Sequence, residues 1–193
     1  MSTTTNAADA ADRYWLRHAI TIAHRSAPVP SAYCVGAVLV SRTSTILPRA
    51  SDAITPPDAP TNQIVLATGF SRELPGNTHA EEVCLLKLPV GTDLAGCTMY
   101  TTMEPCSTRL SGRPSCTGRV LDAKVPRVVM GIVEPADLFV KCTGADTLRE
   151  RGVEVVHIQG LEEECWAPNR HLRERYDDGR NGAPRDSGAA ADA

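Results

Sequence analysis

Two short stretches of the sequence combine residue types that bind a metal ion and move protons. A His-Ala-Glu stretch begins at His79, a Glu-Pro-Cys stretch ends at Cys106, and a further cysteine follows at Cys116. One imidazole and two thiolates suit Zn²⁺, which takes about four ligands and, in catalytic sites, leaves one position open. A carboxylate beside such a site can take a proton from water. The pattern predicts a hydrolytic zinc centre with His79, Cys106 and Cys116 as ligands and Glu81 as the proton carrier.

The predicted secondary structure places these residues at the ends of regular elements. A helical pattern opens at Thr78, so His79 lies in the first turn of a helix. Cys106 follows a predicted strand, and Cys116 begins the next helix. Helix N-termini carry partial positive charge, which favours the thiolate form that binds metal. Because Glu81 is two residues after His79, the two side chains do not share one helix face, and Glu81 can face water without being a ligand.

Each part of the pattern also has a structural interpretation. Thr78 and Glu81 have the spacing of a capping box, in which both side chains satisfy backbone N–H groups at the helix start. His79 alone fits a surface histidine, and Cys106 and Cys116 alone fit buried thiols. The joint pattern favours the zinc site, because three ligand types and a carboxylate all fall where one predicted element meets the next.

A zinc-stabilised binding domain without turnover is an alternative from another functional class. A purely structural zinc usually has four protein ligands. We find three with suitable placement, together with one carboxylate, and this count favours catalysis.

Composition restricts the remaining classes of function. The chain has 193 residues, is 42% hydrophobic and 22% charged, and carries a formal net charge of −3. We expect one domain at 9–176 with disordered ends at 1–8 and 177–193. The net negative charge argues against nucleic-acid binding, and no apolar run is long enough to span a membrane. The seven cysteines, without a signal peptide, indicate thiols or metal ligands in a cytoplasmic or nuclear protein.

Hydrophobic periodicity predicts an α/β fold in which helices cover a sheet with parallel crossovers. The predicted helices are 9–26, 78–88, 116–123, 145–151 and 162–176, and the predicted strands are 35–40, 63–70, 97–102, 127–133 and 153–158. The proline-rich segment 48–61 is a predicted loop. The expected order is therefore α-β-β-α-β-α-β-α-β-α.

Over about residues 12–170 the chain resembles the cytidine-deaminase-like superfamily, and within it the pyrimidine deaminases of the riboflavin pathway. The similar segments are 30–36, 67–81, 101–107, 109–116 and 131–135, and the segment ending at 141 is similar to the fungal branch. In the zinc-deaminase pattern H-x-E…P-C-x(n)-C the glutamate moves protons and is not a ligand. Nine residues separate the two cysteines here, whereas two separate them in the commonest form, which argues against nucleoside and tRNA deaminases.

The resemblance implies a three-layer α/β/α sandwich with a five-stranded mixed sheet. It also implies zinc-dependent deamination of 2,5-diamino-6-ribitylamino-4(3H)-pyrimidinone 5′-phosphate, or of its ribosylamino form, with release of ammonia. Because the chain ends soon after the last deaminase element, we expect a stand-alone deaminase without a reductase domain. Because members of the superfamily are commonly dimers or larger, the resemblance further predicts a homodimer. Deamination of another nucleobase, a nucleoside or tRNA remains open as the alternative.

Five residues are predicted to contact the substrate. Arg109, Arg113 and Lys141 are candidates for the phosphate, because a guanidinium fork suits phosphate oxygens; the alternative for each is a solvated surface charge. Glu134 corresponds to an acidic position of the bacterial family and can accept a hydrogen bond from a ring amine. Asn77 is a candidate for the ribityl chain, with a simple turn as its alternative.

The other cysteines receive no role in the chemistry. Cys34, Cys84 and Cys97 lie in apolar segments and are predicted to be core residues. Cys142 and Cys165 have more polar sequence neighbours and are candidates for surface thiols.

Overall fold

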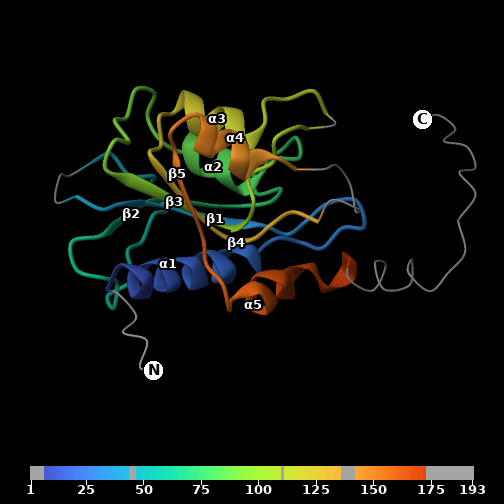
Figure 1. The fold of residues 1–193 in the computed structure, drawn as a ribbon, viewed down its shortest axis with the longest axis horizontal. Helices are drawn as coiled ribbons and strands as arrows, with labels where there is room; N and C mark the ends of the chain where they lie inside the picture. Colours follow the sequence, from blue (N-terminus) through green and yellow to red (C-terminus); the bar gives the residue numbers. More distant parts are fainter. Residues whose placement is uncertain (1–6, 44–46, 110, 136–141, 173–193) are drawn as a thin grey trace, which may run out of the picture.

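The computed structural model describes residues 7–43, 47–109, 111–135 and 142–172, and it confirms the predicted order of helices and strands (Figure 1). The strands are β1 (Gly36–Ser41), β2 (Ile64–Phe70), β3 (Cys97–Met103), β4 (Arg127–Ile132) and β5 (Glu154–His157). The helices are α1 (Ala7–Ala23), α2 (Ala80–Leu86), α3 (Cys116–Asp122), α4 (Gly144–Glu150) and α5 (Glu162–Trp166), followed by the 3₁₀ turn η1 (Ala167–Asn169).

The strands form one mixed sheet in the order β2-β1-β3-β4-β5, as the resemblance implied. β1 pairs antiparallel with β2 and β3, whereas β3, β4 and β5 run parallel. Helices α3 and α4 make the crossovers between the parallel strands, and such strands present their carboxyl ends at one edge of the sheet. The Glu-Pro-Cys stretch follows β3 at this edge.

Helices cover both faces, and each face has its own core. Helices α1 and α5 lie on one face, and α2, α3 and α4 lie on the other (Figure 1). The core beneath α1 contains Trp15 and Tyr100, and the core beneath α2–α4 contains Leu66, Met99 and Leu148; all five side chains are buried. Burying the sheet on both sides explains the continuous apolar strands in the sequence.

A polar cluster lies within the core beneath α1. Arg127 on β4 donates two hydrogen bonds to the carboxylate of Asp12 on α1, at 2.7 and 2.9 Å. The hydroxyl of Tyr100 donates to the same carboxylate at 2.9 Å. Arg127 also pairs with Glu154 on β5 at 2.9 Å, where the carboxylate is 62% exposed. These bonds satisfy the charged groups that α1 and the sheet bury between them.

The last predicted helix, 162–176, is interrupted rather than continuous. α5 ends at Trp166, and residues 170–172 are helical again beyond a 3₁₀ turn. Pro168 lies in this turn, η1, and proline lacks the N–H that an α-helix needs at an interior position. Residues 173–176 lie outside the described residues.

One burial expectation is also wrong. Cys165, a candidate surface thiol, is fully buried because α5 packs closely on β4: a Cβ at Gly131 would lie 2.1 Å from the Cys165 sulfur. Leu86 on α2 is 53% exposed. Two residues along a helix turn the side chain by about 200°, so Leu86 faces away from the buried Cys84. Cys34, Cys84 and Cys97 are buried as predicted.

The ends of the chain are only partly described. α1 begins at Ala7, inside the segment 1–8 that was predicted to be disordered, while 177–193 lie outside the described residues. Within the described ranges, no helix is both long and apolar enough to cross a membrane.

Candidate metal centre and pocket

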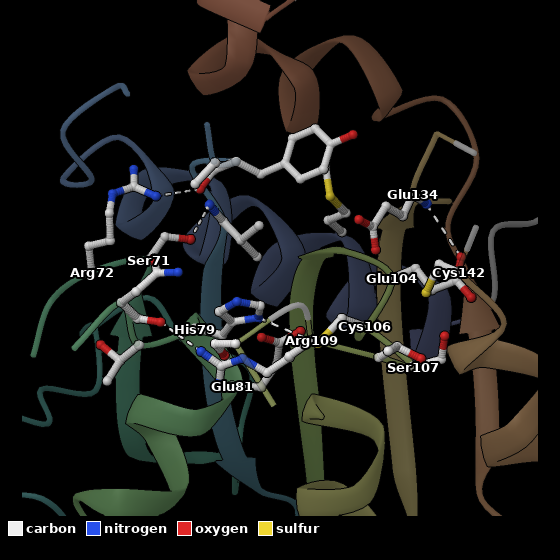
Figure 2. Close-up of a pocket in the computed structure, with 18 of the residues that line it drawn as sticks. Ser71, Arg72, His79, Glu81, Glu104, Cys106, Ser107, Arg109, Glu134 and Cys142 are labelled. Carbon is white, nitrogen blue, oxygen red and sulfur yellow. Dashed lines mark hydrogen bonds between the residues drawn. The ribbon is translucent and has the colours of Figure 1, made fainter. Parts of the chain in front are cut away.

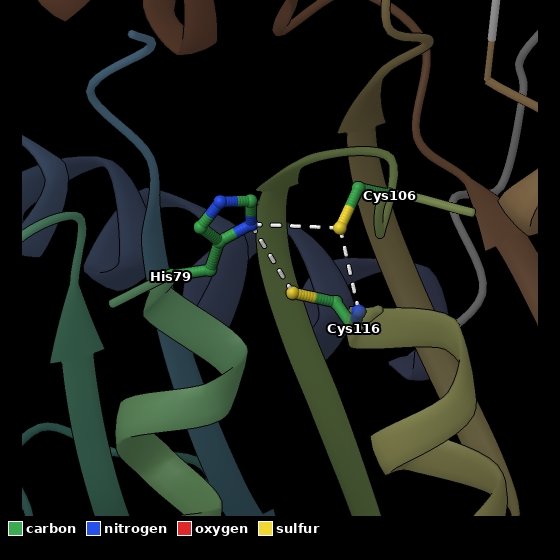
Figure 3. Close-up of side chains that lie close together, drawn as sticks. All are labelled: His79, Cys106 and Cys116. Atoms are coloured by element: carbon green, nitrogen blue, oxygen red, sulfur yellow. Dashed lines mark hydrogen bonds between the residues drawn. The ribbon is translucent and has the colours of Figure 1, made fainter. Parts of the chain in front are cut away.

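Three side chains bring metal-binding atoms together beside the carboxyl end of β3 (Figure 3). Nδ1 of His79 lies 3.5 Å from Sγ of Cys106 and 3.5 Å from Sγ of Cys116. All three donor atoms lie within 4.8 Å of one another. Tetrahedral zinc, with bonds of about 2.0–2.3 Å, places neighbouring donor atoms about 3.5–3.8 Å apart. The donor set and its spacing therefore fit zinc.

Local structure fixes each of these side chains. His79 is the N-cap of α2, with an extended backbone at ψ 157°, and α2 packs so closely on β2 that a Cβ at Gly69 would lie 2.3 Å from the Ala80 carbonyl. Cys116 is the first residue of α3, and the Cys106 sulfur accepts a hydrogen bond of 3.3 Å from its backbone N–H. Ser115 caps α3 by accepting from the N–H of Gly118.

The surroundings of the two cysteines favour a negative charge on sulfur. Hydrogen bonding from Cys116 lowers the pKa of Cys106 to about 4, against the opposing effect of burial, and His79 lowers it further. The same hydrogen bond, together with burial, raises the pKa of Cys116. Metal ligation requires both sulfurs as thiolates, so binding of a metal ion would release any proton that the pair holds.

Glu81 is buried, and Thr101 lies beside its carboxylate. Its side chain lies near His79 in Figure 2, and Oε1 lies 3.3 Å from the hydroxyl of Thr101 on β3. Burial raises the pKa of Glu81, as does the charge of Cys106. A carboxyl group with a raised pKa can exchange a proton near neutral pH, as a proton carrier must.

The capping-box interpretation is wrong by one residue. The N-cap is His79, and its backbone N–H donates to the carboxylate of Glu82 at 3.2 Å. The hydroxyl of Thr78 instead bonds to the backbone of Leu74. Glu82 thus supplies the capping carboxylate, and this leaves the Glu81 side chain directed to the pocket.

A pocket opens above these residues. It is lined by residues 31–33, 35, 71, 72, 77–79, 81, 103, 104, 106–109 and 111, together with Glu134 and Cys142. In Figure 2, Arg72 lies on one side, Glu134 and Cys142 lie on the other, and His79, Glu81 and Cys106 lie between them. A ligand in this pocket would contact both the candidate metal centre and Glu81.

Two of the predicted phosphate ligands already have a carboxylate partner. Arg109 and Arg113 pair with Glu82 at 2.7 and 2.9 Å, and Arg119 on α3 joins them at 2.8 Å. Burial alone would raise the pKa of Glu82, but hydrogen bonds from Arg109 and from the His79 backbone hold it below the ordinary value. Arg109 lines the pocket, and three guanidinium groups facing one carboxylate leave an excess of positive charge.

The remaining predicted substrate residues lie in different places. Glu134 lines the pocket, and burial raises its pKa to about 7. The buried carboxylate of Glu104 positions the neighbouring backbone by accepting from the N–H groups of Glu134 and Ala145. Asn77 is exposed at the pocket rim, has a left-handed backbone at φ 54°, and its carbonyl accepts from Arg109. Lys141 lies outside the described residues.

Sequence reasoning missed Glu82, Arg119 and Thr101 at this site. Glu82 lies next to Glu81, and sequence spacing alone does not tell which of two adjacent carboxylates enters the pocket. Arg119 follows Cys116 by three residues, which places both on one face of α3. This spacing could have indicated that Arg119 lies near the metal centre.

Comparison with known proteins gives a consistent result. Residues 9–132 match the family described as the cytidine and deoxycytidylate deaminase zinc-binding region. A diaminohydroxyphosphoribosylamino-pyrimidine deaminase of Schizosaccharomyces pombe is 40% identical over 158 residues, which cover 80% of this chain and 33% of that protein. The riboflavin biosynthesis protein RibD of Actinobacillus pleuropneumoniae is 38% identical over 110 residues, which cover 56% of this chain and 27% of that protein. This chain therefore spans a third or less of the length of these curated relatives.

Solved structures include similar chains of comparable length. The Rib2 deaminase of Aspergillus oryzae, a C-terminal deletion mutant, aligns with a TM-score of 0.70 and 28% identity, covering 88% of this chain and 97% of that one. Its complex with DARIPP aligns with a TM-score of 0.63 and 26% identity, covering 87% and 99%.

Proposed function

The chain belongs to the cytidine and deoxycytidylate deaminase family, and on that premise we propose that it deaminates a pyrimidine phosphate of riboflavin biosynthesis. The proposed substrate is 2,5-diamino-6-ribitylamino-4(3H)-pyrimidinone 5′-phosphate, and water replaces one ring amino group, which leaves as ammonia. The observation that carries the proposal is the cluster of His79, Cys106 and Cys116 beside the buried Glu81 in one pocket. The names of the fungal and bacterial relatives support the substrate class.

The geometry supports one choice of metal ligands and one proton carrier. His79, Cys106 and Cys116 would hold Zn²⁺, and the bound ion would supply the Lewis acidity that makes water a nucleophile near neutral pH. Glu81 accepts the proton that the attacking water loses. It then donates this proton to the departing amino group, so the carboxylate is regenerated and ammonia leaves. The raised pKa of Glu81 suits both transfers.

The other pocket residues suit binding of the substrate. Glu134 accepts a hydrogen bond from a ring amine when it is ionised, and Asn77 contacts the ribityl chain at the rim. The phosphate is attracted by the excess positive charge of Arg109 and Arg113, with Lys141 as a third candidate. Because Glu82 occupies one N–H of each of these two arginines, phosphate would use their remaining donors.

A substrate panel tests this assignment. We expect ammonia release from the ribityl pyrimidine phosphate at a higher kcat/KM than from its ribosylamino form, cytidine, guanine or adenosine-containing RNA. Preference for any of the last three would reject the substrate class. A protein that binds zinc but turns over none of these amines would instead be a zinc-stabilised binding domain.

The family resemblance also leads us to propose a homodimer, and the unpaired cysteines lead us to propose a cytoplasmic or nuclear location. Sedimentation velocity at micromolar concentration should give a species of twice the chain mass. A single monomeric species over this range would contradict the dimer, and a tagged chain found outside both the cytoplasm and the nucleus by microscopy would contradict the location.

A further inference from the structure

We infer that Glu82 is a positioning residue of the metal centre, which holds the two cysteine-bearing segments and the His79 backbone in place before a metal ion binds. This inference rests on the metal centre of the proposed function, but it does not depend on the identity of the substrate. It assigns a role to a carboxylate that neither binds the metal nor lines the pocket.

The Glu82 carboxylate is fully buried and accepts hydrogen bonds from four donor groups. Oε2 accepts from Nη1 of Arg109 at 2.7 Å and from the backbone N–H of His79 at 3.2 Å. Oε1 accepts from Nη2 of Arg113 at 2.9 Å and from Nη2 of Arg119 at 2.8 Å. The Glu82 side chain is 0% exposed, whereas those of Arg109, Arg113 and Arg119 are 2%, 37% and 23% exposed.

Each donor belongs to a segment that carries or adjoins a ligand. The His79 backbone carries the first ligand, and Arg109 follows Cys106 by three residues in the loop between the cysteines. Arg119 lies on the same helix face as Cys116. One carboxylate therefore makes direct contact with all three segments that must converge on the metal.

The same arginines extend the contacts back to the segment before α2. The second terminal nitrogen of Arg109 donates to the carbonyl of Asn77 at 2.7 Å, and that of Arg113 donates to the carbonyl of Gly76. Asn77 and Gly76 both have positive φ angles, of 54° and 87°, so this turn is not held by a regular hydrogen-bond ladder. The arginine side chains thus fix the turn that leads into His79.

Physical chemistry gives this arrangement a consequence for metal binding. Removing one side of a buried ion pair leaves uncompensated charge, so loss of the Glu82 carboxylate would force Arg109 and Arg119 to move or to recruit water. Their movement would shift the segments that carry Cys106 and Cys116. Outer partners of metal sites typically change metal affinity by about 10–100-fold when they are removed.

A matched control lies on the opposite face of the sheet. Asp12 is also a buried carboxylate bonded to an arginine, Arg127, but within the described part of the chain no hydrogen bond or ion pair joins this pair to His79, Cys106 or Cys116. The variants Glu82→Gln and Asp12→Asn each remove one buried charge and keep the side-chain size. Any general loss of stability should affect both variants.

The experiment measures zinc affinity by chelator competition on the folded full-length chain, with Co²⁺ absorption in the visible range as a reporter of tetrahedral geometry. We expect Glu82→Gln to weaken zinc binding by about 10–100-fold and to alter the Co²⁺ spectrum. We expect Asp12→Asn to keep zinc affinity within about threefold of wild type and to keep the spectrum. Wild-type affinity and spectrum in Glu82→Gln would overturn the inference, as would equal losses in both variants.

A second variant covers the case in which Glu82→Gln does not fold. Arg113→Gln removes the most exposed of the three guanidinium partners and leaves Glu82 paired with two others. We expect a smaller loss of zinc affinity, of about 3–10-fold, and no change at this position would overturn the inference. Because the readout is metal affinity, a wild-type protein that binds zinc but lacks pyrimidine turnover would reject the proposed function while leaving the role of Glu82 standing.

Discussion

Two buried carboxylates pair with arginine on opposite faces of one sheet, and they connect different kinds of structure. Asp12 and Arg127 join a 17-residue helix to an interior strand of the sheet, both of which are regular elements. Glu82 and its three arginines join a helix start, a turn and an irregular loop. Beneath α1, the charge pairs therefore add to contacts that apolar packing already makes. Beside the metal centre, they hold segments that are not fixed by helix or strand hydrogen bonds.

The difference indicates where function can be changed without unfolding the protein. Beneath α1, apolar packing and strand pairing fix the positions of the charged groups. Beside α2 and α3, the ligands Cys106 and Cys116 are joined by a nine-residue segment whose position depends on ion pairs. We therefore expect substitutions beneath α1 to lower the stability of the fold, and substitutions beside α2 and α3 to lower zinc affinity or activity.

The largest effect should come from removing the proton carrier on the metal-centre face. Glu81→Gln keeps the size of the side chain but cannot accept and return a proton, so we expect kcat for ammonia release to fall by about 10²–10⁴-fold. Zinc content, measured by atomic emission, should stay at the wild-type level because Glu81 is not among the clustered ligands. Activity that persists with zinc bound would remove Glu81 from the mechanism.

The next effect compares the two carboxylates through thermodynamic linkage. Zinc stabilises the folded state by an amount that depends on its affinity, so a 10–100-fold loss in Glu82→Gln reduces the added stability by about 1.4–2.7 kcal/mol. Asp12→Asn should lower the free energy of unfolding of the zinc-free protein by about 3 kcal/mol while keeping the full gain from zinc. Chemical denaturation with and without zinc measures both quantities. An equal gain in the free energy of unfolding from zinc in the two variants would contradict this prediction.

A smaller effect concerns the dependence of substrate binding on pH. Burial raises the pKa of Glu134 from 4.5 to about 7, so the group is neutral below that pH and ionised above it. If its ionised form accepts from the ring amine, KM should fall as the pH rises from 6 to 8. Because the folded state holds this proton more tightly than the unfolded state, the free energy of unfolding also falls as the pH rises from about 4.5 to about 7. Nearby Glu104 and Glu81 raise the same pKa further.

The control for this titration is Glu134→Gln, which keeps the shape without the charge. The substrate phosphate still ionises over this pH range when the variant is assayed. The difference between the KM–pH profiles of wild type and variant therefore gives the contribution of Glu134. An identical KM profile in the variant would show that Glu134 does not contact the ring amine.

The smallest effect compares partly exposed members of the two clusters. With zinc at a saturating concentration, Arg113→Gln should raise KM for the phosphorylated substrate by about tenfold with little change in kcat, because a phosphate contact is the same in ground and transition states. Glu154→Gln, which removes the exposed carboxylate paired with Arg127, should change neither parameter and should alter stability by less than about 1 kcal/mol. Steady-state kinetics that show equal changes for both variants would remove Arg113 from substrate binding.

Sequence patterns predicted the elements and the residues closest to the metal. Hydrophobic periodicity predicted the order of the ten α-helices and strands found in the described residues, because buried strands and amphipathic helices have distinct local patterns. The cluster of His79, Cys106 and Cys116 was predicted from residue types at element boundaries. The prediction of one continuous helix over 162–176 missed the 3₁₀ turn at Pro168, where the missing N–H interrupts the α-helical hydrogen bonds.

The partners of charged side chains could not be predicted in the same way. Arg109 and Arg113 were expected to be free for phosphate, but they pair with Glu82, which lies 27 and 31 residues away in the sequence. A guanidinium group binds carboxylate and phosphate with the same geometry, so residue type does not identify the partner. Burial of Cys165 likewise depends on the close approach of α5 to Gly131, which local sequence does not report.

The most direct test of the account is the effect of zinc removal and return on ammonia release from the ribityl pyrimidine phosphate. The account predicts that a chelator abolishes turnover and that one equivalent of zinc restores it, because His79, Cys106 and Cys116 form a single site in the described chain. Turnover that is undiminished in protein shown to be zinc-free, or no turnover in protein holding one zinc per chain, would contradict it.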